Sequence, residues 1–159
     1  EMGGLYALIN IAGGFRFEKL ADGNIDTWDF LYTVNLKTAV NACQAALPHL
    51  LKNRNGRIVN IGAAAAAAKA GAGMGAYAAS KAGVLKLTES LADEVKNDGI
   101  TVNAILPTTI DTAANRKDMP RADFSKWVQP DEIAALIEYL LSGKASAVTG
   151  ANIPIAGRV

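Results

Sequence analysis

A tyrosine and a lysine stand four residues apart in the middle of the chain, just after a glycine-rich stretch. If a helix begins there, Tyr77 and Lys81 lie on the same helical face. An ammonium group beside a phenol favours the phenolate, so the spacing predicts that Lys81 lowers the pKa of Tyr77. A tyrosine tuned in this way can pass a proton to a developing alkoxide or amine. The spacing alone leaves another interpretation open, a surface lysine stacked on a half-buried tyrosine.

Three apolar segments are placed to surround this pair. We expect strands over residues 5–11, 57–61 and 100–106, because each is a short apolar run bounded by turn residues. These runs are followed by residues suited to a binding site, namely Gly13-Gly14, Gly62 and Pro107. In an open parallel sheet, ligands bind beyond the carboxyl ends of the strands. The strand ends therefore predict one crevice that includes Tyr77.

Helical patterns fill the intervals between these strands. We expect helices over residues 26–52, 76–97 and 133–141, the last of which is started by Gln129-Pro130-Asp131-Glu132, with Pro in its first turn. The first should be capped by Asp26 or Thr27 and should bend or end near Pro48. Residues 62–75 and 108–128 are expected as loops, with one helical turn at the alanine run that begins at residue 63. With a last strand over 148–155, the alternation predicts a layered α/β sheet of parallel strands in one domain.

The composition excludes several classes of function. The 159 residues carry 16 lysines and arginines against 15 aspartates and glutamates, which gives no basis for electrostatic capture of nucleic acid or a membrane surface. No run approaches the roughly 20 apolar residues of a membrane helix. Cys43 and His49 are the single cysteine and histidine, so they cannot build a metal cluster between them. We expect Cys43 to be a packing residue rather than a reactive thiol, and a lone thiol fits the cytoplasm.

Several motifs resemble, in the same order, those of the short-chain dehydrogenase/reductase family. The matching segments are Asn10-Ile11-Ala12-Gly13, Asn35-Leu36, Ile58-Val59-Asn60-Ile61, Tyr77-Ala78-Ala79-Ser80-Lys81-Ala82-Gly83, Val102-Asn103-Ala104-Ile105 with Pro107, Ile110 and Thr112, and Thr149-Gly150. The resemblance covers nearly the whole chain. It implies a Rossmann-type doubly wound parallel sheet in three layers and an oxidoreductase that transfers a hydride between NAD or NADP and a small-molecule substrate.

The resemblance also implies roles for individual residues. Tyr77 would be the acid/base, Lys81 would lower its pKa and hold the nicotinamide ribose, and Asn35 would order a proton-relay water. The residues expected along the cofactor are Asn10, Ala12, Gly13, Ile61, Tyr77, Lys81, Pro107, Ile110 and Thr112. Small residues on the two long helices (Ala39, Ala42, Ala46, Ala79 and Ala82) imply a homodimer or homotetramer that pairs through these helices.

The sequence departs from the family pattern where a catalytic serine normally follows the fifth strand. Here the chain reads Gly62-Ala63-Ala64, and Ser80 cannot substitute because it lies inside the helix beside Lys81. Without a hydroxyl at this place, either the substrate does not need that hydrogen bond or the activity has been lost. A non-catalytic nucleotide-binding or regulatory protein therefore stays open as an alternative.

The stretch over residues 115–127 resembles dihydropteridine reductase, a branch of the family that likewise has no serine there. The resemblance implies a quinonoid dihydropterin as acceptor, because an imine-like group does not require the carbonyl-binding serine. A ketone or 3-oxoacyl substrate remains the alternative within the family. Trp28 and Trp127 are expected to be packing residues, although Trp127 could close over a substrate.

The glycine loop that holds a dinucleotide pyrophosphate does not match the glycines near Tyr77. Residues 71–75 precede the tyrosine rather than follow a first strand, so we interpret them as a substrate loop. We therefore expect the pyrophosphate loop, and the residue that selects NAD or NADP, to precede residue 1. On this view, residues 1–159 form a single but incomplete Rossmann-type domain.

Overall fold

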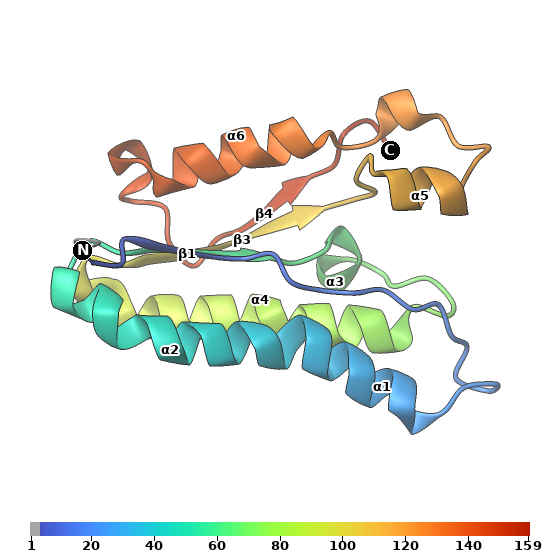
Figure 1. The fold of residues 1–159 in the computed structure, drawn as a ribbon, viewed down its shortest axis with the longest axis horizontal. Helices are drawn as coiled ribbons and strands as arrows, with labels where there is room; N and C mark the ends of the chain where they lie inside the picture. Colours follow the sequence, from blue (N-terminus) through green and yellow to red (C-terminus); the bar gives the residue numbers. More distant parts are fainter. Residues whose placement is uncertain (1–3) are drawn as a thin grey trace.

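The computed structural model describes residues 4–159 and is built around a parallel sheet of four strands (Figure 1). The strands follow chain order across the sheet: β1 (Ala7–Asn10), β2 (Arg57–Ile61), β3 (Thr101–Pro107) and β4 (Asn152–Ile155). The register pairs Asn10 with Asn60 and Ile61 with Ile105, so the carboxyl ends of β1, β2 and β3 meet at one edge. The predicted layered α/β sheet is confirmed.

The two central strands are buried on both faces. β2 and β3 consist mainly of β-branched and apolar residues, which suit a pleated surface covered on both sides. Every residue of β3 is buried, and Ile58, Val102 and Ile105 have no exposed surface. A continuous apolar run such as residues 5–11 is typical of a strand buried on both faces, but β1 is more exposed than the central strands, with Ile9 36% exposed. The reason is that, within residues 4–159, β1 pairs with β2 alone.

One face of the sheet is covered by a long helical rod and a second long helix (Figure 1). The rod consists of α1 (Ile25–Leu31), a π-helical segment η1 (Tyr32–Lys37) and α2 (Thr38–Asn53). The second helix is α4 (Gly75–Val95), which continues into the 3-10 turn η2 (Lys96–Asp98). A core cluster between these helices and the sheet includes Leu50, Ile58 and Leu91.

The opposite face is covered by α6 (Pro130–Leu141) and the 3-10 turn η4 (Gly143–Ala145) (Figure 1). α6 starts where the sequence predicts, because Gln129 and Glu132 form a reciprocal capping box and Pro130 occupies the first turn. Leu140 packs with Val59 and Ile105 in a second core cluster. The sheet therefore lies between two helical layers, as expected for three layers.

Two segments that the sequence assigned to loops contain helical turns. α3 (Ala64–Ala67) is the helical turn expected in the alanine run. The region after β3 is not irregular throughout, because it forms α5 (Ala113–Asp118) and the 3-10 turn η3 (Phe124–Lys126). The Thr112 hydroxyl caps α5 by accepting a hydrogen bond from the Asn115 backbone N–H. Figure 1 places α5 beyond the carboxyl end of β3.

One local prediction about the helical rod is wrong. The N-cap is Asn24 rather than Asp26 or Thr27, because the helix begins at Ile25 and the Asn24 side chain accepts from the N–H groups of Asp26 and Thr27. Pro48 lies inside α2, which ends at Asn53, close to the predicted end at residue 52.

The small residues of the long helices do not share one outer face. Ala39 and Ala46 are 5% and 6% exposed and lie inside the protein's own core. Ala79, by contrast, is exposed. The predicted pairing face therefore cannot include Ala39 and Ala46.

Candidate active site

A cavity of about 720 Å³ opens at the carboxyl ends of β1, β2 and β3. Six of the residues predicted from the sequence line it: Gly13, Ile61, Tyr77, Lys81, Pro107 and Ile110. They come from four separate segments of the chain, which the parallel sheet brings together at the edge where ligands of such sheets bind. The predicted crevice is therefore present.

Tyr77 stands in the first turn of α4 and is half-buried. The edge of its ring meets Phe15, with ring centroids 5.0 Å apart and planes at 81°. This is the edge-to-face arrangement that aromatic pairs favour. Burial raises the pKa of Tyr77 above its ordinary value of 10.0, so the phenol is protonated at neutral pH.

Lys81 lies one turn further along α4 and is 5% exposed. Its ammonium donates a hydrogen bond of 2.8 Å to the carbonyl oxygen of Ile61, at the end of β2. Burial lowers the pKa of Lys81 to about 8, because the charged form loses its hydration. The expected lowering of the Tyr77 pKa is not found in this structure. Loss of hydration on burial determines the pKa of both groups, and the Lys81 ammonium is hydrogen-bonded to the Ile61 carbonyl.

Asn35 is the fully buried amide of the site, with 1% exposure. It lies in the π-helical segment η1, a rare geometry that is frequent at functional sites. Its Oδ1 accepts from the Gly14 N–H at 2.8 Å, and its Nδ2 donates to the Gly14 carbonyl and to Ser80 Oγ at 3.0 Å each. The Ser80 hydroxyl in turn donates to the Tyr77 carbonyl oxygen at 2.8 Å. Asn35 thus connects the loop after β1 to the first turn of α4.

Gly13 fits between Asn35 and Lys81 with no room for a side chain. A Cβ at Gly13 would lie 2.8 Å from Asn35 Oδ1 and 3.2 Å from Lys81 Nζ. We expect Gly13→Ala to displace both groups and to lower the free energy of unfolding by about 1–3 kcal/mol. Denaturant unfolding measures this change. The matched control is Gly143→Ala, whose Cβ would meet nothing within 4 Å. Equal stability of the two variants would contradict the close packing.

Three predicted cofactor residues do not line the cavity. The Asn10 amide donates to Asn60 Oδ1 at 2.8 Å and to Cys43 Sγ at 3.4 Å, which ties β1 to β2 and α2. Thr112 uses its hydroxyl as the cap of α5. Ala12 is exposed just outside the cavity-lining residues.

The place of the family serine is occupied by methyl groups. Ala63, Ala64 and Ala65 line the cavity where β2 passes into α3. No hydroxyl is contributed from this segment, as the sequence predicts. The Ser80 hydroxyl is committed to Asn35 and Tyr77, so it does not replace the missing group.

Further residues line the cavity on two sides. Phe15 and Met74 lie on the side of Tyr77, and Asn115 and Met119 come from α5 and its end. Met74 belongs to the predicted substrate loop over residues 71–75, and Asn115 and Met119 belong to the stretch over residues 115–127. The motif pattern does not place these side chains in the cavity, because the positions of Asn115 and Met119 depend on how the segment after β3 folds. Trp127 is 5% exposed and packs on Phe124 with ring centroids 4.8 Å apart, as expected of a packing residue.

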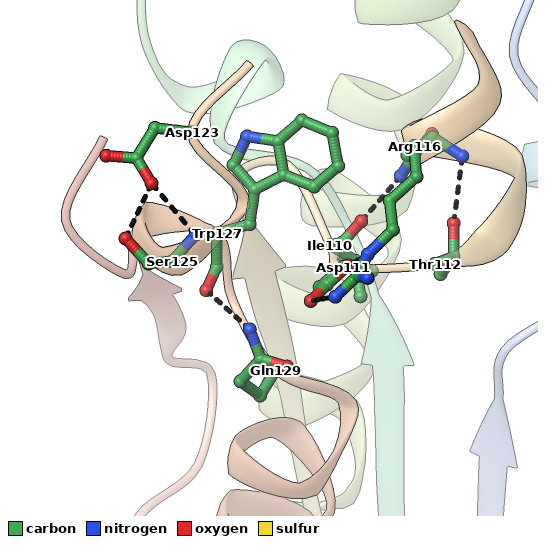
Figure 2. Close-up of polar contacts among 9 residues, drawn as sticks. Ile110, Asp111, Thr112, Arg116, Asp123, Ser125, Trp127 and Gln129 are labelled. Atoms are coloured by element: carbon green, nitrogen blue, oxygen red, sulfur yellow. Dashed lines mark hydrogen bonds and ion pairs between the residues drawn. The ribbon is translucent and has the colours of Figure 1, made fainter. Parts of the chain in front are cut away.

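An ion pair secures the segment that carries Asn115 (Figure 2). Arg116 donates from Nε to Asp111 Oδ1 at 2.5 Å and from Nη2 to Asp111 Oδ2 at 2.7 Å. The Asp111 side chain is 7% exposed, and its bonds to Arg116 hold the pKa of this carboxyl below the ordinary value of 3.8. A bidentate ion pair of this kind fixes the relative orientation of the two side chains more strongly than a single hydrogen bond.

The other residues weighed for reactivity lie elsewhere. Cys43 is buried in the core beneath α2, and burial raises the pKa of its thiol, which suits a packing residue. His49 is exposed near the end of α2.

Among residues 4–159, no group of three or more His, Cys, Asp or Glu side chains is placed to hold a metal ion. In the same part of the chain, no helix has both the length and the apolar character to cross a bilayer.

Comparison with known proteins identifies the family. The family model for short chain dehydrogenases matches residues 1–123. The chain is 35% identical to a 3-oxoacyl-[acyl-carrier-protein] reductase of Thermotoga maritima, covering 99% of this chain and 67% of that protein. It is 31% identical to 2-(S)-hydroxypropyl-CoM dehydrogenase 3 of Xanthobacter autotrophicus, covering 98% of this chain and 66% of that protein.

A solved structure shows the same architecture. The fold is similar to a 3-oxoacyl-[acyl-carrier protein] reductase with bound NAD from Brucella melitensis, with a TM-score of 0.85 and 29% identity. That alignment covers 96% of this chain and 61% of the Brucella chain, so the chain spans about two thirds or less of these relatives. The predicted Rossmann-type fold is confirmed. The chain belongs to the short-chain dehydrogenase family.

Proposed function

We propose that the protein is an NAD(P)H-dependent reductase of a small carbonyl or imine acceptor, with Tyr77 as proton donor. The observation that carries this proposal is the pairing of Tyr77 and Lys81 in a mainly apolar cavity at the carboxyl edge of the sheet. Other polar side chains of the cavity come from the segment after β3, namely Thr108, Thr109 and Asn115. A phenol and an ammonium are therefore the ionisable groups available for proton transfer among its lining residues.

The residues present fit a nicotinamide and its ribose. Gly13, Ile61, Pro107 and Ile110 line the cavity with main chain and apolar side chains, as a flat, uncharged ring requires. The Lys81 ammonium lies at the floor of the same cavity and has donors in addition to the one given to Ile61. When bound, the nicotinamide supplies the hydride, and the protein supplies orientation and the proton. The described residues do not choose between NAD and NADP.

Proton transfer follows from the protonation states of the two groups. Because burial raises the pKa of Tyr77, the phenol carries its proton at neutral pH and can donate it to an oxygen or nitrogen that gains negative charge. In this structure burial sets the pKa of Tyr77 and Lys81 is bonded to Ile61; we infer that during the reaction the Lys81 ammonium, one turn away on α4, stabilises the phenolate that remains. Asn35 acts on the same turn as a positioning residue, through Ser80 and the Tyr77 carbonyl.

Two acceptor classes are supported by different observations. The relatives named as 3-oxoacyl reductases favour a ketone. The methyl groups of Ala63 to Ala65 favour an acceptor that needs no hydroxyl donor at this place, such as an imine of the dihydropterin type. The relatives give no support to a dihydropterin itself. We therefore propose carbonyl or imine reduction and leave the pterin as one probe in the panel.

We further propose a cytoplasmic homo-oligomer acting on a small molecule. The free thiol of Cys43 fits a reducing compartment. Exposed apolar side chains along α1 and η1 (Trp28, Phe30 and Tyr32), together with the exposed Ala79 of α4, offer a surface for a second subunit. Sedimentation of the purified protein tests this assembly, and a monomer at high concentration would contradict it.

The experiment for the proposed activity uses the full-length product of the gene that encodes this chain. NADH or NADPH is mixed with a panel of ketones and with a quinonoid dihydropterin, and oxidation of the nucleotide is followed by its absorbance. We expect acceptor-dependent oxidation. Nucleotide binding without turnover of any acceptor would favour the alternative, a non-catalytic nucleotide-binding or regulatory protein.

The lowered pKa of Lys81 predicts the pH dependence of the reaction. Because the folded protein holds this pKa at about 8, the ammonium is present below that pH and is lost as the pH rises through it. We expect kcat for reduction to be level below pH 8 and to fall above it, long before an ordinary lysine near pH 10.4 would titrate. A pH profile of kcat measures this. A rate that stays level to about pH 10 would contradict a role for the charge.

A further inference from the structure

Asn115 is the amide among the side chains that line the cavity. It comes from α5, whereas Tyr77 comes from the first turn of α4, and Figure 1 shows these two helices on opposite sides of the carboxyl edge of the sheet. The Thr108 hydroxyl is occupied, since it donates to the Ala156 carbonyl at 2.8 Å. The Lys81 ammonium is bonded to Ile61. The Asn115 amide, on the side of the cavity opposite Tyr77, is therefore a candidate to bind a polar group of the substrate.

The orientation of the Asn115 amide is determined by its neighbour. Nδ2 donates a hydrogen bond of 2.7 Å to the carbonyl oxygen of Ile110. A carbonyl can only accept, so the nitrogen of Asn115 must face Ile110, and the flipped amide would bring two oxygens together. Among the described contacts, Oδ1 has no hydrogen-bond partner. The side chain therefore offers Oδ1 as an unused acceptor to a molecule in the cavity, and the second N–H of Nδ2 likewise has no described partner.

The helix that carries Asn115 is held by its N-cap and by the contacts of Arg116. At its start, the Thr112 hydroxyl caps it and Asp111 pairs with Arg116, as Figure 2 shows. The Arg116 guanidinium also lies 4.9 Å from the centre of the Phe124 ring. The flanking stretches are joined by main-chain hydrogen bonds between Thr109 and Val128 and between Asp111 and Val128. A group held this firmly loses little freedom when it binds, which favours specific recognition.

We propose that Asn115 is a specificity-determining residue whose amide oxygen accepts a hydrogen bond from an N–H or O–H group of the acceptor. The proposal rests on the reductase function proposed above and names its substrate class. This class is a heterocycle or related compound in which a C=O or C=N group, directed at Tyr77, has a hydrogen-bond donor nearby. A donor on the substrate satisfies Oδ1, whereas an analogue without it displaces water from the partly buried amide oxygen and gives no hydrogen bond in return.

Isatin and N-methylisatin are the probes that test this assignment. Both are planar rings with a reactive ketone, and they differ in whether the neighbouring lactam nitrogen carries a hydrogen. The affinity of the full-length protein for each is measured by calorimetry in the presence of excess oxidised nucleotide, and turnover is measured separately with reduced nucleotide. The variants are Asn115→Leu, which has similar size and no acceptor, and Asn41→Leu, the same change at an exposed position of α2.

We expect the wild-type protein and Asn41→Leu to bind isatin about tenfold more tightly than N-methylisatin. In Asn115→Leu, this ratio should fall to about one because isatin binds more weakly. If the wild-type protein does not distinguish the probes, the proposal is overturned. It is also overturned if Asn115→Leu retains the preference, because the methyl group is then excluded by its size. Thermal unfolding confirms that both variants are folded.

The outcomes also separate this proposal from the reductase function. A preference for isatin that depends on Asn115, without turnover of any acceptor, would contradict the proposed activity alone. Turnover of ketones with no effect of Asn115 on the ratio would contradict the specificity role alone.

Discussion

Tyr77→Phe should lower kcat for acceptor reduction by about a hundred- to ten-thousand-fold. The change removes the hydroxyl that donates the proton and leaves the ring, so the edge-to-face contact with Phe15 at 5.0 Å is preserved. Lys81 and its bond to the Ile61 carbonyl do not depend on that hydroxyl. Steady-state kinetics with reduced nucleotide measures the loss, and a binding titration should show nearly unchanged affinity for nucleotide.

The matched control is Tyr139→Phe, which removes the same atom from a tyrosine that is 46% exposed on α6. We expect this variant to retain full activity. If Tyr77→Phe and Tyr139→Phe have similar rates, Tyr77 is not the proton donor.

Asn35→Ala should cause the largest loss of stability among the site variants. Asn35 is fully buried and makes hydrogen bonds to both main-chain groups of Gly14 and to the Ser80 hydroxyl. Alanine would leave these groups buried without a partner, which we expect to lower the free energy of unfolding by about 2–4 kcal/mol. For a protein of this size, the melting temperature should fall by roughly 4–16 °C.

Ser80→Ala separates the parts of this network. It removes the single bond between Asn35 and Ser80 and the bond to the Tyr77 carbonyl, while both bonds to Gly14 remain. We expect a loss of about 1 kcal/mol. A melting temperature for Asn35→Ala as high as that of Ser80→Ala would show that the Gly14 contacts contribute little.

The elements that the sequence predicts well are those with strong periodicity. β2 and β3 are continuous apolar runs between turn residues, and α4 follows a clear glycine-rich break, so their positions follow from the pattern of side chains. Because the strands are parallel and adjacent, the meeting of Gly13, Ile61 and Pro107 at one edge also follows from their order.

Other features depend on packing that no local pattern encodes. The π-helical segment around Asn35 adds a residue to one helical turn, and nothing in the composition of residues 32–37 marks it. The folding of α5 depends on the pairing of Asp111 with Arg116 and on the contact with Phe124. Asn115 reaches the cavity only through that arrangement. The pKa values of Tyr77 and Lys81 follow from burial, which the spacing of four residues cannot reveal.

The most direct test of the reductase account follows the hydride itself. NADH or NADPH with deuterium at both hydrogen positions of the transferring carbon is incubated with the full-length protein and a reducible ketone, and the product is analysed by mass spectrometry. The account predicts a product that carries one deuterium from the nucleotide, formed by the wild-type protein and far more slowly by Tyr77→Phe. A product without deuterium, or equal formation by both proteins, would contradict it.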